Sequence, residues 1–217
     1  MRTIKKVASH IFIDGFGGMT QGLFATLIIG TMIQQIGLLI GGSTRNVIYL
    51  LGKAAAALTS AGIGVGVAVK YGESPLVTVS AAVAAMVGGY AGKITGGTFF
   101  VDGNAVLAGP GEPLGAFIAA FAGITCGHLV SGKTKVDIIV TPVITIGAGS
   151  VVGLLVGPPI SQMMTGLGSI INWATEQRPF IMGIVVSVVM GMVLTLPISS
   201  AALGIILNLS GFAAGAA

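Results

Sequence analysis

Residues 19–40 read MTQGLFATLIIGTMIQQIGLLI and contain no charged side chain. A helix needs about 20 consecutive apolar residues to cross a bilayer, so this stretch predicts a transmembrane helix. The whole chain of 217 residues shares this character: 54% of it is hydrophobic, 7% is charged and the mean hydropathy is +1.02. A soluble domain carries roughly 25% charged residues. The composition therefore excludes a soluble enzyme, a disordered tail and a disulfide scaffold, and predicts an all-α integral membrane protein.

Further apolar stretches follow along the chain. They cover 46–69, 76–91, 114–130, 136–156 and 180–196, and a last stretch from Pro197 begins a further helix or a re-entrant hairpin. Pro142 is expected to kink the fifth of the six spans. The chain is thus predicted to be a single membrane-embedded domain over 1–217, a bundle of about six to seven transmembrane helices.

Three segments depart from this pattern. Residues 2–12 carry basic and apolar side chains at helical spacing and predict a surface helix, although a frayed basic leader fits them nearly as well. The proline pair 158–159 is expected to break the chain, and 160–174 then predict an amphipathic interfacial helix anchored by Trp173. Residues 92–115 are too polar for a lipid-facing helix and too apolar for an exposed loop, and they predict a re-entrant segment.

The placement of the basic residues indicates how the chain is oriented, because Lys and Arg prefer the cytoplasmic border of a membrane protein. A cytoplasmic N-terminus places more basic residues inside than outside. Inside are Arg2, Lys5, Lys6, Lys70, Lys133 and Lys135, and outside are Arg45, Lys93 and Arg178. This bias predicts that the N-terminus is cytoplasmic. It also accounts for the net charge of +4 without a nucleic-acid partner.

Glycines recur four residues apart in several predicted spans. The repeats are Gly62 and Gly66, Gly123 and Gly127, and Gly149, Gly153 and Gly157. This spacing removes side chains from one helix face and lets two backbones approach closely. It predicts a tight bundle and is compatible with a homodimer.

Few residues could do chemistry. The sequence has no HExxH, P-loop or CxxC motif, and its two histidines lie far apart. We therefore expect no catalytic residue, no metal site and no cofactor. The single cysteine, Cys126, lies in an apolar run and is interpreted as a small core residue.

Polar residues in an apolar context are the strongest candidates for a binding site. A charge at membrane depth is costly and normally faces a cavity or a partner, and broken segments build substrate sites in transporters. The candidate substrate-binding residues are Glu112, Asp102, Asn104, Thr95 and Lys53. Their acceptors and donors suit a polyhydroxylated or cationic ligand. Two alternatives stay open: 92–115 is a plain hydrated loop, and Lys53 snorkels to the interface.

Three stretches together resemble one protein family. They are FIDGFGGMTQGLFATLIIGTMIQQIG at 12–37, GGTFFVDGNAVLAGPGEPLGAF at 96–117 and GMVLTLPISSAALGI at 191–205. With them the chain is similar to the membrane component, enzyme IIC, of bacterial sugar phosphotransferase systems, and within that family to the stand-alone branch that includes perfringolysin O regulator-like proteins.

The resemblance implies a multi-pass permease in the bacterial inner membrane that moves a small polar solute, a sugar, by alternating access. It also implies separate IIA and IIB phosphotransferase proteins as partners. The run Gly111–Glu112–Pro113 resembles a Glu-Pro motif in a re-entrant loop of sugar-binding members. That match implies that Glu112 hydrogen-bonds a sugar hydroxyl at the site of phosphoryl transfer.

The chain also departs from the family pattern. It carries no IIA or IIB domain, so it supplies no phosphorylated His or Cys, and Cys126 within a span does not replace one. Family members are longer, so we expect a shortened form; at most, the chain is the membrane subunit of a sugar phosphotransferase. Two other functions stay open: a membrane sensor or regulator that keeps the permease fold, and an ion-coupled secondary transporter that uses Asp102 and Glu112.

Overall fold

The computed structural model describes residues 10–40, 42, 44–107 and 109–175, together with 183, 184, 187, 188 and 191. Almost all of this part is helical. In chain order its elements are the π-helix η1 (His10–Gly15), α2 (Phe16–Leu23), the π-helix η2 (Phe24–Ile28), α3 (Ile29–Ile40), α4 (Thr44–Ala57), α5 (Thr59–Lys70), α6 (Pro75–Gly89), α7 (Ala91–Thr95), the strands β1 (Phe100–Val101) and β2 (Asn104–Ala105), α8 (Pro113–Val130) and α9 (Asp137–Thr175).

Several of these helices have the length and composition of membrane spans. Three helical runs qualify by themselves: Ile13–Ile40, Pro113–Val130 and Asp137–Ile170. α4 and α5 qualify together as one span bent by 53°, and α6 is a shorter apolar helix. These correspond to the first five predicted spans, so the all-α membrane architecture is confirmed. Residues 2–9 and most of the stretch after 175 lie outside the described residues, and with them lie the remaining two predicted spans.

The first helical run, from η1 to α3, packs antiparallel against α5 and α4 through glycines. A Cβ added at Gly18 would lie 2.6 Å from the carbonyl oxygen of Gly66, and one at Gly22 would lie 2.3 Å from that of Gly62. Backbones come this close only where side chains are missing. The close packing predicted from the Gly62 and Gly66 repeat is confirmed.

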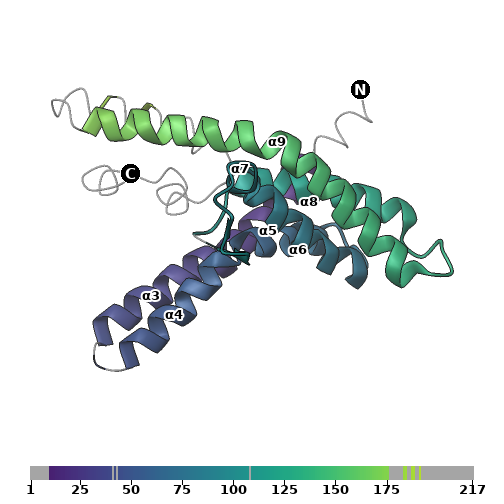
Figure 1. Cartoon of the computed structure of the whole chain (residues 1–217), viewed down its shortest axis with the longest axis horizontal. Coiled ribbons are helices and arrows are strands. Elements are labelled where there is room, and N and C mark those ends of the chain that lie inside the picture. The colour runs from purple at the N-terminus through teal and green to yellow at the C-terminus, as the bar shows by residue number, and fades with distance from the viewer. Residues whose placement is uncertain are drawn as a thin grey trace.

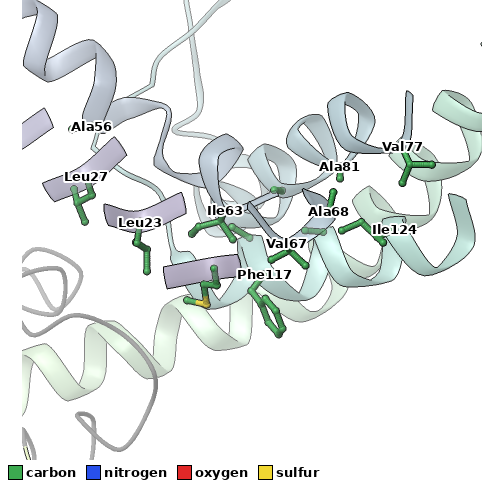
Figure 2. Packing of buried hydrophobic residues seen from close by; sticks show 14 of the residues in the cluster. Leu23, Leu27, Ala56, Ile63, Val67, Ala68, Val77, Ala81, Phe117 and Ile124 are labelled. Atoms are coloured by element: carbon green, nitrogen blue, oxygen red, sulfur yellow. The ribbon is translucent and has the colours of Figure 1, made fainter. Parts of the chain in front are cut away.

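α5, α6, α8 and α9 form the rest of the bundle. Its apolar core includes Ile63 and Val67 of α5, Ala81 of α6 and Phe117 and Ile124 of α8, which are all buried (Figure 2). Small residues again set the distances between the helices. A Cβ at Gly123 of α8 would lie 2.7 Å from the carbonyl oxygen of Thr145 in α9, for example.

α9 does not end at the proline pair, so the predicted break at 158–159 is wrong. The helix runs without interruption from Asp137 to Thr175 and contains Pro142, Pro158 and Pro159. Each proline removes a backbone hydrogen bond but holds φ near the helical value. α9 also packs closely against α7 directly before the proline pair, where a Cβ at Gly157 would lie 2.5 Å from the Ala91 side chain. Residues 160–174 therefore form the C-terminal half of α9 rather than a separate helix, and their interfacial position stays a prediction.

α3 and α4 form an arm that projects from the bundle (Figure 1). Large apolar side chains cover its surface, and Leu39 is the most exposed of them at 85%. A surface of this kind suits hydrocarbon rather than water. The arm also divides the molecule into two parts, which meet at the junction between α4 and α5.

Candidate functional site

The regular α-helical geometry is interrupted at two places that face each other: between α4 and α5, and in η2 of the first helical run. α4 and α5 separate at Leu58, which has φ −86° and ψ 10°. The first helical run changes to π-helical geometry in η2, which contacts both α4 and α5. Contacts of Gly22 with Gly62 on one side and of Gly30 with Gly52 on the other place η2 opposite this break. Interruptions of this kind free backbone groups and are frequent at functional sites.

Two hydroxyl groups hold the loop 109–112 beside the α4–α5 break. The hydroxyl of Tyr90 donates to the carbonyl oxygen of Gly109 and also to that of Ala57, the latter at 3.2 Å. The hydroxyl of Ser60 donates to the carbonyl oxygen of Pro110 at 3.0 Å. The loop is therefore bound directly to α5 and to Tyr90 at the end of α6, and Tyr90 connects it to the end of α4.

Glycine is required where the loop passes Ser60. Gly111 has φ +75°, a conformation that other residues rarely adopt. A Cβ there would also lie 2.4 Å from the Ser60 hydroxyl oxygen. Both the backbone conformation and the close approach therefore exclude a side chain at this position.

Glu112 ends the loop and caps α8. Its backbone N–H donates to the carbonyl oxygen of Gly89 at 2.7 Å, and its carboxylate accepts from the backbone N–H groups of Leu114 and Gly115. Burial raises the pKa of the Glu112 carboxyl, and these two N–H groups lower it in part. Each carboxylate oxygen has two acceptor positions. The carboxylate can therefore cap the helix and still accept a hydrogen bond from a ligand hydroxyl.

The structure spreads the five predicted site residues over four places. Glu112 lies at the α4–α5 break. Asp102 and Asn104 lie in the exposed β1–β2 hairpin, where the Asn104 amide donates to the Asp102 carbonyl oxygen at 3.3 Å. Thr95 is exposed at the end of α7, and Lys53 is exposed on α4. Within the described residues, no hydrogen bond joins Glu112 to any of the other four.

Ser60 and Tyr90 are the residues of this region that the sequence did not reveal. Tyr90 is 1% exposed, and the ring of Phe99, just before the β1–β2 hairpin, lies 5.4 Å from its ring. Lys93 places its Nζ atom 5.4 Å from the centre of the same ring, and burial lowers the pKa of this lysine. Both Ser60 and Tyr90 lie near helix ends in uncharged surroundings. A polar residue next to a small-residue run is a weak signal that could have drawn attention to them.

Comparison with known proteins gives one match. A family model described as "Phosphotransferase system, EIIC" matches residues 13–217. No curated protein and no solved structure matches the chain. The matched range includes the loop 109–112, Tyr90, the α4–α5 break and nearly all of the described residues. The chain therefore belongs to the phosphotransferase system EIIC family, the membrane permease component of that transport system.

Proposed function

We propose that this permease binds a sugar beside Glu112 and moves it across the membrane by alternating access, with a separate IIB protein that supplies the phosphoryl group. The observation that carries the proposal is the convergence of the loop 109–112, Tyr90 and Ser60 at the break between α4 and α5. Transporters commonly bind their substrates where membrane helices are interrupted. Here the hydroxyls of Tyr90 and Ser60 hold the loop at the interruption, and the loop leads directly to Glu112, whose carboxylate caps α8.

The chemistry of this place suits a sugar. A sugar hydroxyl both donates and accepts hydrogen bonds, and a carboxylate is the strongest neutral-pH acceptor that a side chain offers. Glu112 provides that acceptor and is held in position by the start of α8. We include Asp102 and Asn104 in the proposal as the outer part of the site, because the β1–β2 hairpin follows Phe99, which packs on Tyr90. Thr95, at the end of α7, stays a predicted substrate-binding residue. Lys53, on α4, also stays a predicted substrate-binding residue.

The shape of the chain supports alternating access. The α3–α4 arm and the bundle of α5, α6 and α8 meet at a bend of 53°, and the π-helical η2 lies opposite that bend. A movement of one part against the other would be centred on this level. The bound sugar would then be exposed to one side of the membrane or to the other.

We propose that the phosphoryl donor lies outside these 217 residues. The chain holds two His and one Cys in all. His128 contacts Glu73 at 3.0 Å, and Cys126 lies within α8. We propose IIA and IIB proteins as the partners that complete the transfer.

The test is sugar binding by the purified protein in lipid nanodiscs. A panel of hexoses and hexitols is screened by thermal stabilisation, because a ligand adds RT ln(1 + [L]/Kd) to the stability of the state that it binds. Glu112→Gln is expected to weaken the binding of the best ligand at least tenfold, roughly the value of a hydrogen bond to a charged group. Glu73→Gln makes the same chemical change at the opposite end of α6 and is expected to leave the affinity unchanged.

Other outcomes would point elsewhere. Unchanged affinity in both Glu112→Gln and Asp102→Asn would remove the proposed site. Binding without uptake in vesicles that contain IIA and IIB would favour a sensor. Uptake that needs a proton or sodium gradient but no phosphotransferase proteins would favour an ion-coupled transporter.

A further inference from the structure

A groove with polar side chains in its lining lies between α7 and α9, and Glu112 is not among its lining residues. Its volume of about 440 Å³ is within the range of small-molecule sites. α7 contributes one face to it, with Gly92, Thr95 and Gly96 at helical spacing. α9 contributes the facing side, with Pro158, Ser161, Gln162 and Thr165, again at helical spacing.

The described residues that line this groove carry no charge, and four of them have polar side chains. Among the described residues, neither the Ser161 hydroxyl nor the Gln162 amide has a hydrogen-bond partner. Thr95 and Thr165 use their hydroxyl hydrogens on the carbonyl oxygens of Ala91 and Ser161, at 2.9 and 2.8 Å. Their oxygens can still accept. The groove therefore offers donors and acceptors together, which is what a hydroxyl-rich ligand needs.

Gly92 of α7 and Gly96, directly after α7, leave this wall of the groove without side chains at these two positions. At Gly92 the Ser161 hydroxyl of α9 lies against the backbone, since a Cβ there would lie 2.8 Å from its oxygen. Gly96 is exposed at the end of the helix. On the α7 side, the described wall of the groove therefore consists of backbone atoms and the Thr95 side chain.

We propose that this groove is a second binding site for the uncharged sugar, one that rejects the phosphorylated product. None of the seven described residues that line it is ionisable, whereas a phosphate monoester carries a charge of about −1.5 to −2 and requires cationic partners or several N–H donors. The inference rests on the proposed function, because it takes the transported solute to be a sugar. The groove would hold the sugar before its phosphorylation and would lose it once the phosphate is attached.

The groove and Glu112 are both connected to the junction between α6 and α7. The Glu112 N–H donates to the Gly89 carbonyl oxygen, and Gly92 is three residues further along the chain, so at most about 11 Å separates Gly89 from Gly92. Tyr90 and Ala91 lie between them in the chain. The two sites would thus share one wall, the junction between α6 and α7.

The first experiment measures the affinity for the best neutral sugar of the panel and for glucose 6-phosphate in nanodiscs free of glycoside detergent. Ser161→Ala and Gln162→Ala together are expected to lower the sugar affinity of the groove about tenfold, the value of one or two lost hydrogen bonds. Ser169→Ala and Gln35→Ala, at exposed positions outside the groove, are the matched controls and should change nothing. Glucose 6-phosphate is expected not to bind in the groove.

A second variant adds the charge that the groove lacks. Gln162→Arg is expected to create binding of glucose 6-phosphate, and Gln35→Arg on α3 is not. A third measurement locates the ligand: Gln162→Cys in a Cys126→Ala background should react with N-ethylmaleimide, and the neutral sugar should slow this reaction. No protection by the sugar, or equal binding of sugar and sugar phosphate by the unaltered protein, would overturn the inference.

The outcomes separate this inference from the proposed function. If Glu112→Gln loses the sugar and the groove variants keep it unchanged, the groove is refuted and the site at Glu112 stands. If the groove variants weaken binding and Glu112→Gln does not, the groove stands and the site at Glu112 falls. If no sugar of the panel stabilises the unaltered protein or slows the labelling, both are refuted.

Discussion

Tyr90 shows how much of the candidate site depends on a single hydroxyl group. Its side chain is almost fully buried, and its O–H reaches the carbonyl oxygens of Ala57 and Gly109. Tyr90→Phe keeps the ring but leaves both carbonyls without this donor. We expect a loss of about 1–3 kcal/mol in the free energy of unfolding, together with weaker sugar binding because the loop 109–112 is no longer held.

The measurement is thermal unfolding in detergent, followed by the sugar titration. Tyr49→Phe is the control, since its hydroxyl has no hydrogen-bond partner recorded among the described residues, and it should change the stability by less than about 0.5 kcal/mol. Equal stability of Tyr90→Phe and the unaltered protein would show that the Tyr90 hydroxyl does not hold the loop.

At the scale of single residues, the sequence alone pointed to Glu112 of the candidate site but not to Ser60. Glu112 could be singled out because it is one of the few charged residues of the chain and stands in the irregular, glycine-rich segment 92–115. Ser60 could not, because its partner Pro110 is 50 residues away and only the folded chain brings them together. Long-range contacts of this kind leave no local pattern.

At the scale of the helices, glycine contacts between backbones set the spacing. Gly22 is the most constrained position of the first helical run, since a Cβ there would lie 2.3 Å from the Gly62 carbonyl oxygen. The atom that it would meet belongs to the backbone and cannot rotate away. Gly22→Ala is therefore expected to push the two helices apart and to cost about 1–3 kcal/mol of stability.

Gly147→Ala supplies the matched control, because nothing lies within 4 Å of a Cβ added there in α9. Alanine favours a helix more than glycine does, so this variant should be neutral or slightly more stable. Thermal unfolding of the two variants side by side checks the prediction. A Gly22→Ala protein as stable as Gly147→Ala would mean that the first helical run does not pack as described.

The helices also show which structural features hydropathy can and cannot predict. The first five spans could be placed because each is a long apolar run. The break at Leu58 could not, because the surrounding residues are Ala54–Ala57 and Thr59, and none of them is a proline or glycine. The opposite error occurred at Pro158 and Pro159, where local sequence predicts a break and α9, packed against α7, is continuous.

At the scale of the whole molecule, the contacts between turns determine which charges share a side of the membrane. The turn after α5 lies beside the turn after α8, because Ser74 and Ser131 place their hydroxyl oxygens 3.0 Å apart and Glu73 contacts His128. Lys70 and Lys133 are therefore at the same end. Arg45 lies at the far end of the α4–α5 pair, separated from Lys70 by about 35–40 Å of helix.

This arrangement turns the charge bias into a prediction about topology. Lys70 and Lys133 belong to the larger basic set, so their end should be cytoplasmic and Arg45 should face the outside. In a Cys126→Ala background, Arg45→Cys is expected to react with a membrane-impermeant maleimide added to intact cells. Lys133→Cys should react only after the membrane is permeabilised. The reverse labelling pattern would show that the chain has the opposite orientation in the membrane. Labelling of both positions from outside would contradict the fold itself, because the α4–α5 pair would then not cross the membrane.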